Sequence, residues 1–398
     1  MKKLMAMAAL LVFLSGSAAW AAEWNFYGSA RVNTSYSEFD NNPFTSGGAA
    51  LGLATGEDTE NYEQKLYGNA RIGANVKVSD SLTGRFEYGT LSGNSNVRIL
   101  WGEWNFGAGS LGVGKHYTPL LFPYSNQVYS IDALGKGDHN MSTFGMLYGQ
   151  REAMIRLTFG NFQIALVEPR DVVAHRFETT QRTVGGLGNA LNAPETEVQF
   201  PNIQAKYKYD FDNGHIAVAG GYQTFDVVDN NTTYDVNSYV LALGGRFNVG
   251  KAYFKGNVWG GQNVGNLADI LVSGSLWSTT ENANTSTFDG LGWGFAEWDE
   301  GSATGTVALT DNDALAALIV AGYEIRKGLY LEAGYGYVST ELDRSGTEKN
   351  DADTFYLQST IFFAPGVFMT PEFGIHDSNE GDTEPYVRYF AIKWQINF

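Results

Sequence analysis

The chain ends in Tyr389-Phe390-Ala391-Ile392-Lys393-Trp394-Gln395-Ile396-Asn397-Phe398, and this stretch decides the fold. Apolar residues occupy every second position from Phe390 to Phe398, while Lys393, Gln395 and Asn397 lie between them. A β-strand with this alternation has one apolar face and one polar face. Such a strand suits a barrel wall between lipid and water. Soluble sandwiches also alternate, so the rest of the chain has to separate the two.

The amino terminus predicts export from the cytoplasm. Residues 1–21 are expected to be a secretory signal peptide, because Lys2 and Lys3 precede an apolar stretch and Ala19-Trp20-Ala21 forms a cleavage site. The apolar stretch is shorter than the ~20 residues of a spanning helix. Residues 22–398 are then expected to form a single domain. Its most helix-like segment, 314–325, fits one barrel strand better.

Composition favours an outer-membrane barrel over a soluble exported protein. The chain has no cysteine, so no disulfide supports a small secreted fold. It contains 48 Gly, 22 Tyr and 25 Phe but only 9 Pro, as expected for many strands with aromatic residues at both interfaces. A closed barrel needs no disulfide, because its backbone hydrogen bonds are satisfied between strands.

The alternation predicts an all-β transmembrane antiparallel barrel of sixteen strands. The expected strands are 24–36, 62–78, 82–91, 97–106, 111–118, 151–159, 162–168, 202–210, 215–228, 236–248, 251–263, 314–326, 329–341, 352–363, 367–377 and 386–398. The expected short turns are 79–81, 107–110, 160–161, 211–214, 249–250, 327–328 and 364–366. The expected loops are 37–61, 92–96, 119–150, 169–201, 229–235, 264–313, 342–351 and 378–385. Residues 305–310 leave eighteen strands as an alternative.

Alternation also predicts which side chains face the lumen. In strand 62–78, Leu66 and Ile72 share the apolar face, whereas Lys65 and Arg71 share the polar one. Charged side chains on the inner face require water, and a barrel of sixteen strands is wide enough for an aqueous channel. In strand 97–106 the apolar residues change parity, which predicts a β-bulge.

Two stretches, 101–107 and 111–119, resemble the fourth and fifth strands of trimeric general diffusion porins, where a G-x-x-x-F-G…L-x-x-G-R run leads into a long third loop. The terminal Phe398 is similar to the closing residue of Gram-negative outer-membrane barrels. The resemblance implies a homotrimer in the outer membrane, with loop 119–150 folded inward to narrow the pore. Lys115 stands where the family has arginine, which keeps the charge but loses the planar guanidinium.

The resemblance further implies a constriction in which loop acids face a basic wall. The candidate loop acids are Asp132 and Asp138. The candidate wall bases are Arg31, Lys65, Arg71, Arg85, Arg98 and Lys115. Opposite charges across a narrow gap interact more strongly than on an open surface. The alternative is that these bases are the scattered charges of any wet barrel wall.

Acidic loops dominate the charge balance, which is −17 overall. Loops 264–313 and 378–385 contain Asp269, Glu281, Asp289, Glu297, Asp299, Glu300, Asp311, Asp313, Glu380, Asp382 and Glu384. They predict a solvated rim that enriches cations, and allow loosely bound Ca²⁺ shared with lipopolysaccharide phosphates. No other cofactor is expected. Weak cation selectivity is our expectation, although the basic wall opposes it. Trp277, Trp293 and Trp298 either stack on sugars or pack a folded loop.

No catalytic arrangement is evident. The histidines His116, His139, His175, His215 and His376 lack metal-ligand spacing, and His116 is expected on the lipid or subunit face because Lys115 is placed inward. We therefore expect no enzyme. Three functions remain: a general porin for small hydrophilic solutes and ions, a channel selective for sugars or small acids, and a plugged structural or adhesive barrel. Outer-membrane lipid and lipopolysaccharide are the expected surroundings, and no nucleic-acid partner is expected.

Overall fold

The computed structural model describes residues 22–42, 57–90, 94–129, 140–142, 144–176, 195–229, 232–268, 294–299, 308–343, 349–378 and 386–398. Within these residues the chain is almost entirely β-strand. None of the described helices is long and apolar enough to span a membrane. The expected signal peptide, 1–21, lies outside the described residues.

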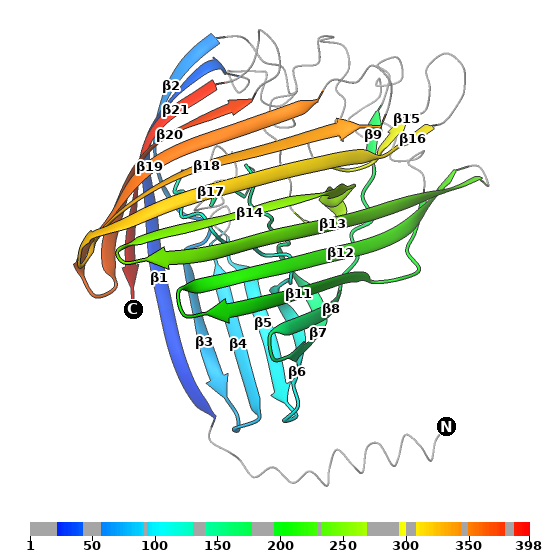
Figure 1. Cartoon of the computed structure of the whole chain (residues 1–398), viewed down its shortest axis with the longest axis horizontal. Helices are drawn as coiled ribbons and strands as arrows, with labels where there is room; N and C mark the ends of the chain where they lie inside the picture. The colour runs from blue at the N-terminus through cyan, green and yellow to red at the C-terminus, as the bar shows by residue number, and fades with distance from the viewer. Residues whose placement is uncertain are drawn as a thin grey trace.

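The barrel strands follow one another around a single wall (Figure 1). They are β1 (Glu23–Asn42), β2 (Glu57–Leu66), β3 (Arg71–Lys77), β4 (Leu82–Gly89), β5 (Asn96–Asn105), β6 (Ser110–Tyr117), β7 (Arg151–Phe159), β8 (Phe162–Val167), β10 (Glu195–Glu197), β11 (Asn202–Phe211), β12 (Gly214–Asp229), β13 (Thr232–Val249), β14 (Ala252–Gln262), β17 (Asn312–Arg326), β18 (Leu329–Leu342), β19 (Asn350–Ala364), β20 (Val367–Ser378) and β21 (Tyr386–Asn397).

These strands make sixteen crossings of the wall, as the alternation predicted. Two crossings are split into two strands each: β2 and β3 both pair with β1, and β10 and β11 both pair with β12. The wall closes where β1 pairs antiparallel with β21, for example Val32 with Trp394. Within the predicted stretch 305–310, the described part, β16 (Ala308–Thr310), belongs to a separate small sheet and does not add a crossing, while residues 305–307 lie outside the described residues.

The carboxy-terminal alternation is confirmed in three dimensions. Trp394 and Ile396 are about half exposed on the outer face, whereas Lys393 and Gln395 are buried on the inner face. The seven predicted short turns are also confirmed, and glycines with positive φ occupy several of them, including Gly160, Gly250 and Gly328. All seven lie at one end of the barrel.

One predicted loop is wrong. Residues 229–235 were expected to form a loop, but β12 continues to Asp229 and β13 begins at Thr232, with these two residues directly paired. The polar residues around this connection therefore extend a hairpin beyond the membrane span. Their polarity reflects exposure to water and not the absence of strand structure.

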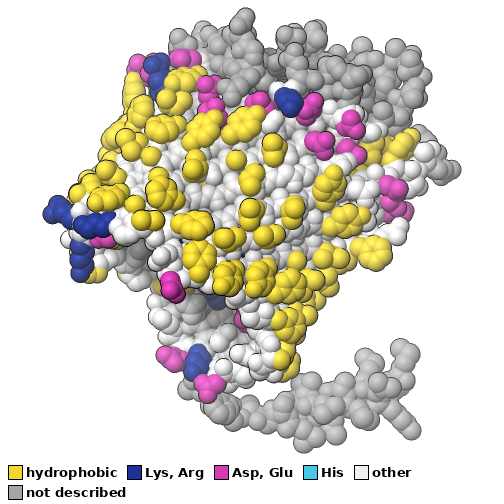
Figure 2. Space-filling view, viewed as in Figure 1, with side chains coloured by type: hydrophobic (Ala, Val, Ile, Leu, Met, Phe, Trp, Pro, Cys, Tyr) yellow, Lys and Arg dark blue, Asp and Glu magenta, His cyan; other side chains and the backbone are white. Residues whose placement is uncertain are grey.

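The outer face carries a continuous apolar surface. Figure 2 shows hydrophobic side chains spread over the visible wall, with acidic side chains gathered along the upper border. On the barrel strands, the side chains of Leu241, Ile319, Leu315 and Leu100 are 56% to 66% exposed. A solvent-facing surface of this kind is unfavourable in water but favourable against lipid. The chain is therefore a transmembrane β-barrel.

The interior holds the third loop and part of the sixth. The described arms of loop 119–150 contribute Leu120, Phe122, Val128 and Phe144 to the main buried cluster, which also includes inner-wall residues. The third long loop therefore folds inward, as predicted. At the start of loop 264–313, the 3₁₀ turn Val264–Asn266 is buried and lies near the same cluster.

A small separate sheet joins two loops on the wall. It contains β9 (Ala174–Arg176), β15 (Glu297–Asp299) and β16. Trp298 is buried in an apolar cluster with Phe225 and Val236 from β12 and β13. Its ring meets that of Tyr234 edge-on at 5.1 Å. Trp298 therefore packs a folded loop, whereas Trp277 and Trp293 lie outside the described residues.

Candidate functional site

The third loop is held against one side of the lumen by a buried carboxylate on β20. Glu372, 1% exposed, accepts hydrogen bonds from the backbone amides of Val128 and Tyr129 at 2.9 to 3.0 Å. Tyr389 donates its hydroxyl to the same carboxylate at 3.0 Å. A carboxylate buried in this way needs such donors, so the loop and the wall stabilise each other.

A second inner-wall carboxylate, Glu332, binds the third loop at Asn126. Glu332 on β18 accepts hydrogen bonds from the side-chain amide of Asn126 at 2.7 Å and from its backbone amide at 3.2 Å. Lys255 on β14 pairs with Glu332 at 2.9 Å, and Tyr356 donates to it at 2.7 Å. This part of the wall is consequently neutral and occupied by the loop.

The returning arm of the loop is fixed by its backbone. Gly145 has φ of +104°, and its carbonyl accepts hydrogen bonds from Asn257 at 2.8 Å and Trp259 at 2.9 Å. A β-carbon at this position would lie 2.2 Å from the carbonyl oxygen of Ala317. Glycine is therefore required, because it permits both the conformation and the close approach. Both described arms thus line the wall from β11 to β21 and reach Tyr67, between β2 and β3, whose hydroxyl donates to the carbonyl oxygen of Val128 at 3.0 Å.

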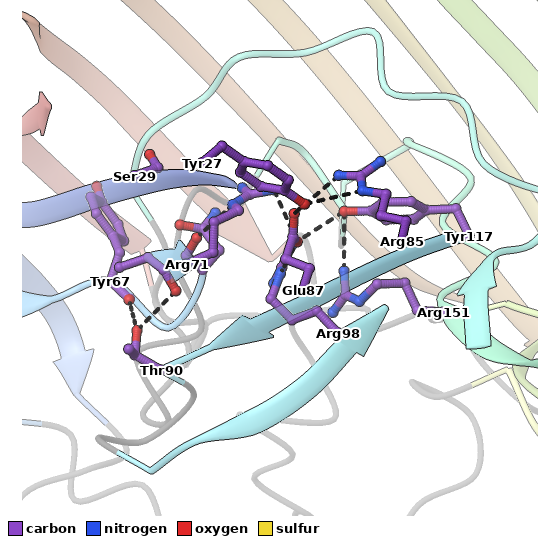
Figure 3. Close-up of polar contacts among 12 residues, drawn as sticks. Tyr27, Ser29, Tyr67, Arg71, Arg85, Glu87, Thr90, Arg98, Tyr117 and Arg151 are labelled. Carbon is purple, nitrogen blue, oxygen red and sulfur yellow. Dashed lines mark hydrogen bonds and ion pairs between the residues drawn. The ribbon is translucent and has the colours of Figure 1, made fainter. Parts of the chain in front are cut away.

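The opposite wall carries an arginine-rich cluster around Glu87 (Figure 3). The carboxylate of Glu87 is fully buried and accepts hydrogen bonds from Arg98 Nε at 2.7 Å, Tyr27 at 2.9 Å and Arg85 at 3.1 Å. Arg71 lies 3.4 Å from the same carboxylate. The four partners come from four strands, β1, β3, β4 and β5 in chain order. One anion therefore gathers three cations on the lumen face.

Tyr117 extends this cluster to the root of the third loop. Its hydroxyl oxygen accepts from Arg98 at 3.2 Å and from Arg151 at 3.3 Å. Arg151 also donates to Tyr148 at 2.7 Å, where the loop returns to β7. We define the Glu87 cluster as Tyr27, Arg71, Arg85, Glu87, Arg98, Tyr117 and Arg151. Its position is level with the point at which loop 119–150 enters the barrel.

The Glu87 cluster has a net positive charge. Four arginines and one glutamate give +4 − 1 = +3. The side chains of Arg85 and Arg71 remain 35% and 19% exposed, whereas that of Arg98 is only 6% exposed. Arg85 and Arg71 are therefore exposed to lumen water. Arg98 is buried, and its guanidinium donates to the carboxylate of Glu87.

A β-bulge positions Arg98. Between β4 and β5, Glu87 pairs with Ile99 and Tyr88 pairs with Val97, so Arg98 is the extra residue. The bulge predicted from the parity change in strand 97–106 is thus confirmed. An extra residue in one strand changes the face of the sheet on which the neighbouring side chains lie. Here it turns both Ile99 and Arg98 away from the lipid.

The predicted wall bases separate into three groups. Arg71, Arg85 and Arg98 come together, and Arg31 lies beside them, because its partner Ser29 is directly across from Arg71. Lys65 pairs with Glu63 at 2.7 Å on β2, away from the Glu87 cluster. The predicted loop acids Asp132 and Asp138 lie outside the described residues.

Lys115 lies on the outer face and is not part of the Glu87 cluster. Its cross-strand partners are Ala153 and Leu100, and Leu100 is 61% exposed on the lipid side. Directly opposed residues share a face of the sheet. The expectation for His116 is correspondingly wrong: its ring packs on the inward-facing Trp101 with centroids 5.2 Å apart. The family motif predicted a basic residue at position 115, but the pairing register of β6 places its side chain on the outer face.

Glu87, Arg151, Tyr27 and Tyr117 were not predicted as site residues. Glu87 shares inward parity with Arg85, so the alternation of strand 82–91 carried a usable signal. Arg151 begins a later strand and reaches the cluster because β7 pairs with β6, which places Arg151 directly opposite Tyr117. Among the described residues, no group of three or more His, Cys, Asp or Glu is placed to hold a metal ion.

Comparisons with solved structures show the fold. No protein-family model and no curated protein matches the chain. The outer membrane channel DcaP of Acinetobacter baumannii aligns with a TM-score of 0.64 and 14% identity, over 96% of this chain and 99% of that chain. The anion-selective porin from Comamonas acidovorans gives 0.53 and 10%, over 94% and 100%.

A third similar structure is the trimer form of OmpT, an outer membrane protein of Vibrio cholerae. It aligns with a TM-score of 0.50 and 15% identity, over 95% of this chain and 99% of that chain. The identities are low, so the shared feature is the architecture. The chain has the fold of the outer-membrane porins.

The assigned faces of β6 can be tested with a matched pair of thiols, because the chain has no cysteine. In His116→Cys, a charged, water-soluble thiol reagent is expected to react from the lumen and to lower the conductance. In Lys115→Cys, the thiol faces lipid or protein and is expected to react much more slowly. Faster reaction at position 115 than at position 116 would reverse the assigned faces.

Removing the carboxylate of Glu372 is expected to loosen the third loop. Glu372→Ala leaves two backbone amides and a buried hydroxyl without their acceptor, at a cost of about 1–3 kcal/mol. The barrel should still fold, while open-channel current noise and protease cleavage within 119–150 increase. Asp212→Ala, in an exposed turn, is the control. Unchanged noise and cleavage in Glu372→Ala would show that this carboxylate does not hold the loop.

Proposed function

We propose that the protein is a porin in the outer membrane of a Gram-negative bacterium, forming a water-filled channel for passive diffusion of small hydrophilic solutes and ions. The porin fold and the apolar outer face support the location. The observation that carries the proposal is the Glu87 cluster, a charged wall in contact with lumen water at the level of the third loop. Such a wall is unfavourable in a lumen packed with apolar side chains.

We further propose that the channel favours anions. The Glu87 cluster has a net charge of +3, and the opposite wall pairs Glu332 with Lys255 and covers Glu372 with the loop. Charge near the narrowest point governs selectivity, because rim charges are screened beyond ~8 Å at physiological salt. The acidic loops led us to expect weak cation selectivity. The charge of the Glu87 cluster leads us to propose anion selectivity instead.

A homotrimer is proposed as the functional assembly. Lys115 lies on the outer face, where a charge exposed to hydrocarbon is unfavourable. Contact with a second subunit would cover it, and closed cyclic symmetry accommodates three such faces. The trimer form of a structure with the same fold agrees with this arrangement. Loosely bound Ca²⁺ shared between acidic loops and lipopolysaccharide stays a prediction.

The channel itself is tested by single-channel recording of purified protein in a planar bilayer. Large conductance steps that arrive in groups of three are expected for a trimer of open barrels. Folded, heat-modifiable protein that gives no steps would contradict the open channel. That result would favour the alternative of a plugged structural or adhesive barrel.

Anion preference should depend on the exposed arginines. Arg71→Gln with Arg85→Gln lowers the formal charge of the Glu87 cluster from +3 to +1. A charge at ~7 Å in water contributes about 0.6 kcal/mol, or roughly threefold in ion distribution. The anion-to-cation permeability ratio is therefore expected to fall severalfold. Arg326→Gln with Lys327→Gln, at an exposed turn, also removes two positive charges and is the charge-matched control; an equal fall in that variant would contradict a local role.

A further inference from the structure

A pocket of about 440 Å³ opens on the lumen side of β1 and β3 to β7. It lies between the Glu87 cluster and the short turns, since its lining reaches the paired residues Lys77 and Thr83 at the end of the β3–β4 hairpin. Its lining includes Arg85, Trp101, Glu103, His116 and Arg156. This volume is within the range of about 300–1,000 Å³ for small-molecule sites.

Arg156 enters this pocket with unused hydrogen-bonding capacity. Its Nε is buried and has no partner among the described residues. Its other contacts are long: 3.5 Å to the carbonyl oxygen of Tyr117 and 3.5 Å to the carboxylate of Glu103. A guanidinium has five N–H donors in a fixed plane. Most of them therefore lack a good acceptor at 2.7–2.9 Å, the usual distance for charged pairs.

The guanidinium of Arg156 is nevertheless fixed in orientation. Its Cζ lies 4.7 Å from the ring centroid of Trp101, which is only 7% exposed. The indole N–H of Trp101 donates to Glu103 at 3.1 Å. Glu103 is thereby held beside the indole. Arg156 consequently presents a positioned guanidinium whose carboxylate partner, Glu103, stands at 3.5 Å, and its planar donors suit bidentate binding of an oxyanion.

Arg85 connects this pocket to the Glu87 cluster. Its guanidinium donates to Glu87 and Tyr27, and the same side chain lines the pocket. The charged lining residues are Lys77, Arg85 and Arg156 against Glu23 and Glu103, which gives +3 − 2 = +1. An anion moving toward the short turns would therefore pass from one cationic site to a second one that shares an arginine.

We propose that this pocket is a second anion subsite, which binds the carboxylate or phosphate group of a small solute through the guanidinium of Arg156. Arg85 contributes the neighbouring positive charge, and the His116 ring closes one side against Trp101. The inference concerns a site separate from Glu87 and does not depend on the ion selectivity of the pore.

Binding is measured with two probes, inorganic phosphate and acetate, added to purified protein in detergent. The line widths of the phosphate ³¹P signal and the acetate carboxyl ¹³C signal report exchange with a protein site. Wild-type protein is expected to broaden at least one signal in a saturable manner. Arg156→Gln should weaken that binding at least fivefold, and Arg156→Lys should recover part of it, because lysine keeps the charge but not the planar fork.

Equal broadening by Arg156→Gln and wild-type protein would overturn the proposal, as would equal loss in the control Arg326→Gln. If Arg156→Gln fails to fold, as judged by heat-modifiability, Arg156→Lys decides: binding unchanged from wild type overturns the site, and reduced binding supports it. Reversal potentials separate this outcome from the proposed function. Arg156→Gln leaves the Glu87 cluster intact, so the channel should keep its anion preference while the subsite is lost.

Discussion

The charged wall depends on the ion pairs between the buried carboxylate of Glu87 and the arginines around it. Without this carboxylate, the guanidinium groups of Arg71, Arg85 and Arg98 would repel one another on adjoining strands. With it, a β-bulge at Arg98 and the hydroxyl of Tyr27 complete a network that holds cations against the lumen. One anion among several cations gives a wall that is both stable and net positive. The acidic composition of the whole chain, −17, conceals this local reversal of sign.

Elsewhere on the inner wall, buried carboxylates bind the third loop and do not gather arginines. Glu372 and Glu332 are also inward-facing carboxylates, but their acceptors are taken up by backbone and side-chain donors of the third loop. The described arms of the loop line the wall from β11 to β21, whereas the residues of the Glu87 cluster lie on β1 and β3 to β7. The described residues of this loop, 119–129, 140–142 and 144–150, include no Asp, Glu, Lys or Arg. These arms therefore do not balance the charge of the wall around Glu87.

Alternation along the chain predicted the crossings, the turns and the inward positions of Arg71 and Arg85, because side-chain period and lipid exposure impose the same pattern on every strand. It did not predict partners distant in sequence, such as Glu372 with the amide of Val128, since a loop's path inside a barrel leaves no periodic signal. Lys115 was misplaced because a family motif was given priority over parity. The described structure leaves Asp132 and Asp138 as predictions.

We propose that the cationic wall around Glu87 sets the ion preference of the pore. The most direct measurement is the sign of the reversal potential of the wild-type protein in a planar bilayer under a potassium chloride gradient. A sign that corresponds to preferential chloride permeation is predicted. A sign that corresponds to preferential potassium permeation would contradict this proposal, and would place the controlling charges in the acidic loops.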